Sequence, residues 1–228
     1  HLYLSKGEFT QSFTFQSRIT TVGERNLNIN LTSGSERQKL AYLATFTEES
    51  DRTISLHVED TPNYVAARDL ALTIILQRKG RALDAMTDSV ALLRRRANPD
   101  DRALLDQLQE TNTQLSRLVL NGSPRIVPPD YQAKIKGLEE QKEKLESDIS
   151  RRSAEFRAQA MPVTIEAVQA AIPAQAALVE FTRYRPFNPK YQKAAERFGS
   201  PRYVAYVLPH QGEAQWVELG EAKAIDET

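Results

Sequence analysis

The stretch YQAKIKGLEEQKEKLESDIS at residues 131–150 decides the fold class. Alternate steps of four and three residues place a stripe of side chains on one face of an α-helix. The stripe consists of Tyr131, Ile135, Leu138, Lys142, Leu145, Ile149, Arg152 and Phe156. Most other positions in the stretch are charged. The sequence therefore predicts a long helix that packs along this stripe and exposes a solvated outer face.

Two similar stripes precede this one. The first consists of Leu72, Leu76, Lys79, Leu83, Met86, Val90, Leu93 and Ala97. The second consists of Leu104, Leu108, Thr111, Leu115 and Leu118. Asn98-Pro99-Asp100-Asp101 separates them, because Asn caps a helix, Pro fits its first position and acidic residues favour its positive end. Three long helices with short connections predict antiparallel neighbours in a coiled-coil-like bundle.

Several turn and cap signals divide the first half of the chain. Gly80 lies within the first stripe, costs about 1 kcal/mol relative to alanine and predicts a kink or a close helix contact. Ser35 and Gln38 have the spacing of a capping box, which predicts a helix that carries Leu40, Leu43 and Phe46. A short helix is expected to begin at Asp51 or Thr53 and to end at Thr61-Pro62.

The pattern changes from helical to extended after Met161-Pro162. Short apolar runs at 177–181, 202–208 and 214–219 are typical of β-strands, and Pro209-His210-Gln211-Gly212 is typical of a turn between two of them. The predicted fold class is therefore mainly α, with a small C-terminal β portion.

Composition excludes several functional classes. The chain has 30 basic and 30 acidic residues, so it has no net charge with which to attract nucleic acid or an anionic membrane. It contains no cysteine, which excludes disulfides, thiolate metal sites and a cysteine nucleophile. No run of apolar residues is long enough to cross a membrane. The absence of cysteine fits a reducing compartment, and we expect a cytoplasmic location.

Few residues are candidates for chemistry. His57 lies beside Glu59 and Asp60, which permits an acid–base pair, but a helix-end role is the simpler interpretation. His210 is expected to be a turn residue, and the clusters Arg94-Arg95-Arg96 and Arg151-Arg152 lack the aromatic residues of a nucleic-acid site. We therefore predict no catalytic, cofactor-binding or metal-binding residue.

The segment between the first two predicted strands is the best candidate for a partner contact, because aromatic and basic residues alternate in it. The candidate residues are Arg183, Tyr184, Arg185, Phe187 and Tyr191. The alternative is an excursion between strands whose aromatic side chains pack over a sheet edge, and that alternative is favoured.

Several segments resemble a known protein family. The stretch 2–9, followed by Ser12, Gln16 and Ile19, is similar to the second half of a degenerate tetratricopeptide repeat. The stretches 34–43, 76–85 and 150–157 also take part in the resemblance. The stretches ALVEFTRYR at 177–185, RYVAYVLP at 202–209 and WVELG at 216–220 resemble the opening of a CHAT domain, a caspase-like domain attached to tetratricopeptide repeats.

The resemblance implies three consecutive parts. Residues 1–61 would be the end of a repeat array, residues 62–160 a long-helix linker, and residues 161–228 the N-terminal part of a truncated α/β caspase-like domain. In the family, activity would rest on a His–Cys dyad on loops after later strands, beyond residue 228. We therefore expect a non-catalytic scaffold or regulatory fragment that binds protein partners through its helical-repeat part.

Two alternatives stay open at this point. The chain could be part of a cysteine endopeptidase that is completed by residues beyond 228. It could also be a coiled-coil oligomerisation module, for which a homodimer is the simplest form.

Overall fold

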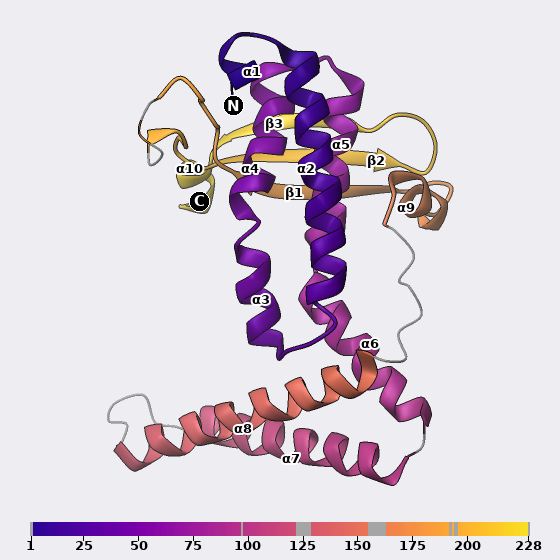
Figure 1. The fold of residues 1–228 in the computed structure, drawn as a ribbon, viewed down its shortest axis with the longest axis vertical. Coiled ribbons are helices and arrows are strands. Elements are labelled where there is room, and N and C mark those ends of the chain that lie inside the picture. Colours follow the sequence, from indigo (N-terminus) through magenta and orange to yellow (C-terminus); the bar gives the residue numbers. More distant parts are fainter. Residues whose placement is uncertain are drawn as a thin grey trace. The chain divides into compact units, whose positions relative to one another are not determined.

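The computed structural model describes residues 2–96, 98–121, 129–154, 163–191, 193 and 196–227 (Figure 1). The described part of the chain is mainly helical with one small antiparallel sheet, which confirms the predicted fold class in that form. Its helices are α1 (Leu2–Ser5), α2 (Phe9–Asn30), α3 (Glu36–Ala44), α4 (Thr47–Ser55), the π-helix η1 (Leu56–Asp60), α5 (Val65–Arg78), α6 (Arg81–Arg96), α7 (Pro99–Asn121), α8 (Pro129–Ala154), α9 (Ile165–Ala171) and α10 (Ala222–Asp226). Its strands are β1 (Ala177–Tyr184), β2 (Arg202–Pro209) and β3 (Gln215–Glu221).

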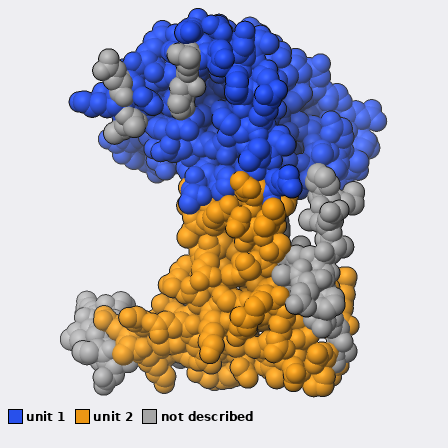
Figure 2. Space-filling model, viewed as in Figure 1, with its two compact units in different colours: residues 1–25, 45–79, 161–228 blue, residues 26–44, 80–160 orange. Residues whose placement is uncertain are grey.

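The chain divides into two compact units (Figure 2). Unit 1 consists of residues 1–25, 45–79 and 161–228, and unit 2 consists of residues 26–44 and 80–160. The units cut across the three consecutive parts implied by the family resemblance, because α5 packs with α4 and joins the same core as the sheet. The assignment of those parts to a repeat array, a linker and a CHAT domain stays a prediction.

The sheet of unit 1 has the strand order β1-β2-β3, and both pairs are antiparallel. All three strands lie where the sequence predicted them, each extended by one to three residues at its C-terminal end. A register shift between Tyr203 and Val204 interrupts the β2–β3 pairing. Because alternate residues point to opposite faces, Tyr184, Tyr206 and Leu208 lie on one face, where they are buried.

Helices cover this face of the sheet (Figure 1). One continuous apolar core joins side chains of α4, η1 and α5 to the buried face of the strands. Its main members are Ile54, Val58, Ala71, Leu72, Ile74, Ile75, Tyr184, Val204, Tyr206 and Leu208. Burying such side chains stabilises the unit by about 25 cal/mol per Å² of apolar surface. Residues more than 100 positions apart in sequence therefore share one core.

Unit 2 contains the helices of the predicted bundle. Helix α8 packs against both α6 and α7, and the predicted stripe of α8 is buried at Leu138, Leu145 and Ile149. Met86 and Leu93 are the buried positions of the α6 stripe. The predicted continuations to Ala97 and Phe156 lie outside the described residues, as do Met161-Pro162 and the side chain of Leu83.

Three predictions of helix boundaries were wrong. The helix expected to carry Phe46 ends at Ala44. The first stripe is not one helix, because α5 ends at Arg78 and α6 begins at Arg81. Gly80 between them has a φ of 71°, a left-handed conformation that glycine adopts without strain. The helix expected from Asp51 or Thr53 instead begins at Thr47, where two glutamates in the first turn complement the helix dipole.

The capping box at the start of α3 is confirmed. The Ser35 Oγ atom accepts a hydrogen bond of 3.2 Å from the backbone N–H of Gln38, and the Ser35 N–H donates one of 3.0 Å to Gln38 Oε1. Ser35 is fully buried, so water cannot replace these bonds. The box fixes the point at which the chain turns into α3.

We expect Ser35→Ala to lower the free energy of unfolding by about 1 kcal/mol, because one helix N–H loses its acceptor. Urea denaturation followed by circular dichroism measures the change. The control is Ser33→Ala, at an exposed position in the same turn. Equal stability of the two variants would contradict a contribution from the cap.

Candidate functional site at the helix–sheet junction

The polar contacts between the helices and the sheet of unit 1 form the most elaborate site among the described residues, called here the junction. It is built around η1, where the helix begun by α4 widens into a π-helix before it ends at Thr61. The Thr61 hydroxyl donates a hydrogen bond of 2.7 Å to the Leu56 carbonyl. This bond supplies a partner for one of the carbonyls at the helix end that lack an intrahelical donor. Such π-turns recur at functional sites because they redirect side chains.

Tyr184 at the end of β1 is the centre of the junction. Its hydroxyl oxygen lies 2.8 Å from Glu59 Oε1 and 3.1 Å from Glu218 Oε1. A phenol has one proton, so we assign the donated hydrogen bond to the shorter contact with Glu59. Arg202 forms an ion pair with Glu218 and balances the second carboxylate. Burial and then the Glu59 carboxylate raise the pKa of Tyr184, so the phenol keeps its proton.

His57 is buried two residues before Glu59 in η1. Its Nδ1 atom lies 2.8 Å from the hydroxyl of Tyr206, and its ring meets Trp216 edge-on at a centroid distance of 4.7 Å. Burial, and then the positive charge of Arg68, lower the pKa of His57 to about 4. Burial also raises the pKa of Tyr206, so the phenol and the imidazole are both uncharged and share one hydrogen bond, whose direction depends on the His57 tautomer.

Helix α4 holds the chain that follows β1. Asp51 accepts hydrogen bonds from the backbone N–H of Arg185 at 3.2 Å and from its Nε at 2.7 Å. Ser55 Oγ accepts from the backbone N–H of Phe187 at 2.8 Å. Asp51 and Ser55 are one helical turn apart and are both buried, so three hydrogen bonds to two successive turns fasten residues 185–187 to α4.

Arginine–aromatic stacking completes the α4 side of the junction. The Arg185 guanidinium lies 4.3 Å from the centroid of Phe198, and that of Arg52 lies 5.2 Å from the centroid of Phe187. Phe187 and Phe198 are themselves in contact, with centroids 5.2 Å apart. Each such contact is worth about 0.5–1 kcal/mol at a partly exposed site. Lys79, after the end of α5, adds an ion pair to Glu180 of β1.

The five residues predicted to contact a partner differ in exposure. Tyr184 and Phe187 are buried at 1% and 5% exposure and make their contacts inside the junction. Arg185 is half-buried against Asp51. Arg183 and Tyr191 are exposed, Tyr191 by 51%. The partner contact stays a prediction, and these two side chains are the accessible ones.

Sequence reasoning missed the residues on the helix side of the junction. Asp51 and Ser55 have no local motif that distinguishes them. His57, Glu59 and Asp60 were noticed as a polar cluster, but their partners lie more than 100 residues later in the chain. The signal available in the sequence was the mixture of apolar and polar residues at the end of the predicted short helix.

The hydrogen bonds of the junction join α4 and η1 to the strands and to the chain that follows β1. The described hydrogen-bonding partner of the His57 ring is a phenol, not a carboxylate or a nucleophile. No group of three or more metal-ligating side chains occurs in the part of the chain that the structure describes. Most polar groups of the junction pair with one another, whereas the buried His57 Nε2, Asp60 Oδ2 and Arg52 Nε atoms have no hydrogen-bond partner in the described part of the chain.

The opposite face of the sheet carries apolar side chains that no described residue covers fully. Val179, Phe181, Val217 and Leu219 are between 41% and 60% exposed. Phe181 and Val217 flank Ala205 in the strand register, so they form a row across the sheet. Apolar side chains on both faces are typical of an inner sheet layer.

Comparison with known proteins identifies no relative. No protein-family model matches the sequence, and no curated protein or solved structure is significantly similar to it. Over the described residues, none of the helices has both the length and the apolar character that a bilayer span requires. The resemblance to CHAT-domain proteins rests on the quoted segments.

The junction predicts a specific pH dependence of stability. The pKa of His57 falls from 6.5 to about 4 on folding, so the unfolded chain binds the extra proton between these values and stability rises with pH. Burial, and then Glu59, raise the pKa of Asp60 from 3.8 to about 6, so the folded chain binds the extra proton and stability falls with rising pH. The two slopes oppose each other between pH 4 and 6.

We expect Asp60→Asn to remove the fall in stability with rising pH that Asp60 causes, which leaves the rise that His57 causes. Relative to the unmodified chain, its free energy of unfolding should rise by about 2 kcal/mol between pH 4 and pH 6.5. His57→Gln should show the opposite trend. Urea titrations at several pH values, with Trp216 fluorescence as the probe, measure both. Asp106→Asn, at an exposed position on α7, is the control, and parallel pH profiles for all four proteins would contradict the assignment.

Proposed function

We propose that this chain is a non-catalytic scaffold that fixes the end of a tetratricopeptide array to the beginning of a caspase-like CHAT domain. The observation that supports the proposal most is the direct packing of α4 and η1 on the sheet within one compact unit. Under the family resemblance, α4 belongs to the repeat side and the strands belong to the CHAT side. The proposed scaffold acts through this junction and does not require the long linker.

The junction has the energy needed to couple the two sides. A ligand that moved α4 would separate Asp51 from Arg185 and Ser55 from the Phe187 N–H. Leaving a buried carboxylate or N–H without a partner costs a few kcal/mol. Coupling free energies of 1–3 kcal/mol are typical of allosteric proteins, so these bonds are sufficient. A change in the helices would then move the chain at the end of β1.

The exposed face of the sheet fits the same proposal. A caspase-like domain has its sheet between layers of helices, and the face that carries Phe181 and Val217 is apolar and accessible. Residues beyond 228 would supply the missing layer and, in the peptidase alternative, the His–Cys dyad. Binding of protein partners through the helical-repeat part, and a cytoplasmic location, belong to the same proposal.

The coiled-coil alternative has less support. Helices α6, α7 and α8 pack on one another within the chain, and Leu93 of the α6 stripe and Ile149 of the α8 stripe are fully covered. A stripe that is already covered cannot also form a seam with a second chain.

The scaffold proposal predicts that α4 controls the mobility of β1. In the double variant Asp51→Asn, Ser55→Ala, amide hydrogen exchange of residues 178–191 should accelerate about tenfold, because two buried bonds to α4 are lost. Exchange in α7 and α8 should not change. Glu140→Gln removes an exposed ion pair to Lys136 within α8, away from the junction, and is the control. Unchanged exchange in 178–191 of the double variant would refute coupling through the junction.

The assembly state separates the scaffold from the oligomerisation module. We expect a monomer of 25.7 kDa by size-exclusion chromatography with light scattering at concentrations up to about 100 μM. A stable dimer that dissociates when Leu145→Lys is introduced would favour the coiled-coil alternative. A dimer that persists in this variant would place the contact elsewhere.

A further inference from the structure

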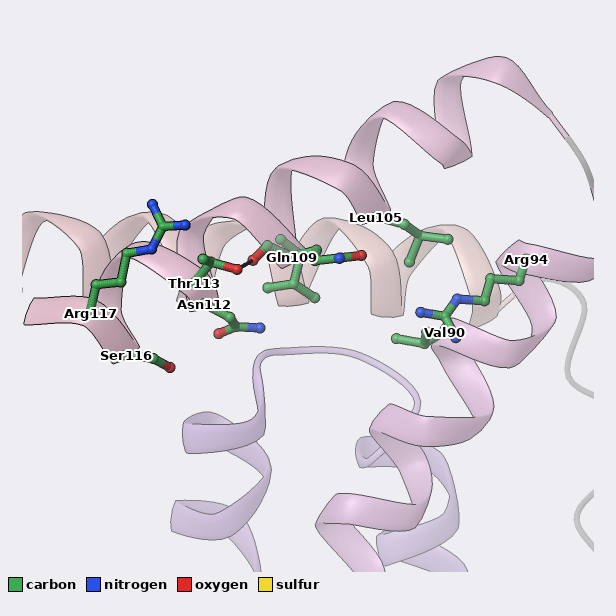
Figure 3. Close-up of a pocket in the computed structure, with 9 residues that line it drawn as sticks. Val90, Arg94, Leu105, Gln109, Asn112, Thr113, Ser116 and Arg117 are labelled. Carbon is green, nitrogen blue, oxygen red and sulfur yellow. Dashed lines mark hydrogen bonds between the residues drawn. The ribbon is translucent and has the colours of Figure 1, made fainter. Parts of the chain in front are cut away.

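A hollow in unit 2 lies between α6 and α7, apart from the junction (Figure 3). It has a volume of about 590 Å³. The described lining residues are Val90, Arg94, Leu105, Leu108, Gln109, Asn112, Thr113, Ser116 and Arg117. Those of α7 recur at helical spacing, so one face of that helix forms most of the surface. From Leu105 to Arg117 this face is about 18 Å long, at 1.5 Å per residue.

The chemistry of the hollow varies along its length. Val90, Leu105 and Leu108 are half-buried and supply apolar surface. Arg94 and Arg117 are exposed and lie toward opposite ends, with the side chains of Gln109, Asn112 and Thr113 between them (Figure 3). The Thr113 hydroxyl donates a hydrogen bond of 2.9 Å to the backbone carbonyl of Gln109. No described hydrogen bond engages the side-chain amide groups of Gln109 and Asn112.

The charges of the hollow are of one sign. The described lining residues include two arginines and no carboxylate. Within the described part of the chain, neither guanidinium has an ion-pair partner. Other arginines of the chain do, including Arg152 with Asp101 and Arg37 with Glu143 in the same unit. The hollow is therefore complementary to an elongated partner with a negative charge near each end.

Other ligand classes fit less well. Nucleic acid would need more cations and aromatic rings for stacking, and the described lining contains no ring. A single phosphate would need arginines that converge, whereas these two are separated along the hollow (Figure 3). A peptide with an apolar side chain between two carboxylates matches both the charges and the apolar surface that Val90, Leu105 and Leu108 supply. Free amide groups suit its backbone N–H and C=O groups.

We propose that the α6–α7 hollow binds an acidic peptide segment of another protein, with an apolar side chain on Val90, Leu105 and Leu108 and a carboxylate at each of Arg94 and Arg117. An extended chain advances about 3.3 Å per residue, so two carboxylates six residues apart span the face of α7. The proposal is independent of the scaffold function, since it uses residues of unit 2 alone.

The test uses a fluorescein-labelled, terminally blocked peptide, GEASLSAEG, in which a leucine lies midway between two glutamates. Fluorescence anisotropy with the full chain should give saturable binding with a Kd of about 100 μM, as expected for one apolar anchor and two surface ion pairs. Arg94→Glu and Arg117→Glu should each weaken binding about tenfold. Arg102→Glu, at an exposed position of α7 outside the hollow, is the matched control and should not change the Kd.

A charge-reversed peptide makes the test specific. GKASLSAKG should not bind the unmodified chain but should bind the double variant Arg94→Glu, Arg117→Glu, with circular dichroism confirming that the variant is folded. Replacing the central leucine by serine should weaken binding of the acidic peptide about fivefold. Absence of saturable binding below 1 mM, or equal binding by the Arg102→Glu and Arg117→Glu variants, would overturn the proposal.

Discussion

The constraint on which unit 1 depends is that polar groups buried beneath η1 must find partners in the sheet. Tyr206 places its hydroxyl group beside the buried ring of His57, and the hydroxyl group of the buried Tyr184 lies beside the carboxylate of Glu59. A shift of β1 by one residue would turn Tyr184 to the other face and leave Glu59 without its donor. The polar contacts therefore select the strand register, while the surrounding apolar core supplies most of the stability.

The same constraint gives the junction its proposed role. Asp51 and Ser55 hold the backbone that leaves β1, and Glu59 holds the side chain at the end of that strand. Three consecutive turns of helix thus control one strand end. If the family resemblance is correct, this end is where a repeat array and a caspase-like domain meet. The neutral His57 and the raised pKa of Asp60 are consequences of burial at this meeting point, and they need no catalytic role.

Sequence periodicity predicted the elements of the fold better than their connections. The stripe of α8, the capping box of Ser35 and the strand positions follow from local chemistry, which the chain carries within a few residues. The break at Gly80 was expected only as a kink, because the stripe continues on both sides of it. The π-helix η1 has no local sequence signal, and its buried His57 contacts Tyr206 and Trp216, which lie about 150 residues later.

The candidate site was harder to predict, because its contacts join residues that are far apart in the sequence. Tyr184 and Phe187 alternate with basic residues, a pattern that also occurs on partner-binding surfaces, and only the tertiary contacts of α4 bury them. The α6–α7 hollow was seen in the sequence only as the basic cluster at Arg94. Its second arginine, Arg117, is on another helix, and no local pattern joins the two.

The central claim is that the helices and strands of unit 1 form a single cooperative body. Native-state hydrogen exchange as a function of urea concentration tests it most directly, because each amide reports the free energy and the surface exposed when its region opens. The account predicts that the slowest amides of α4, α5 and β2 converge on one opening reaction, with a common free energy and a common dependence on urea. If the amides of β2 opened at lower free energy while those of α4 and α5 stayed protected, the sheet would be an independent element and the account would be contradicted.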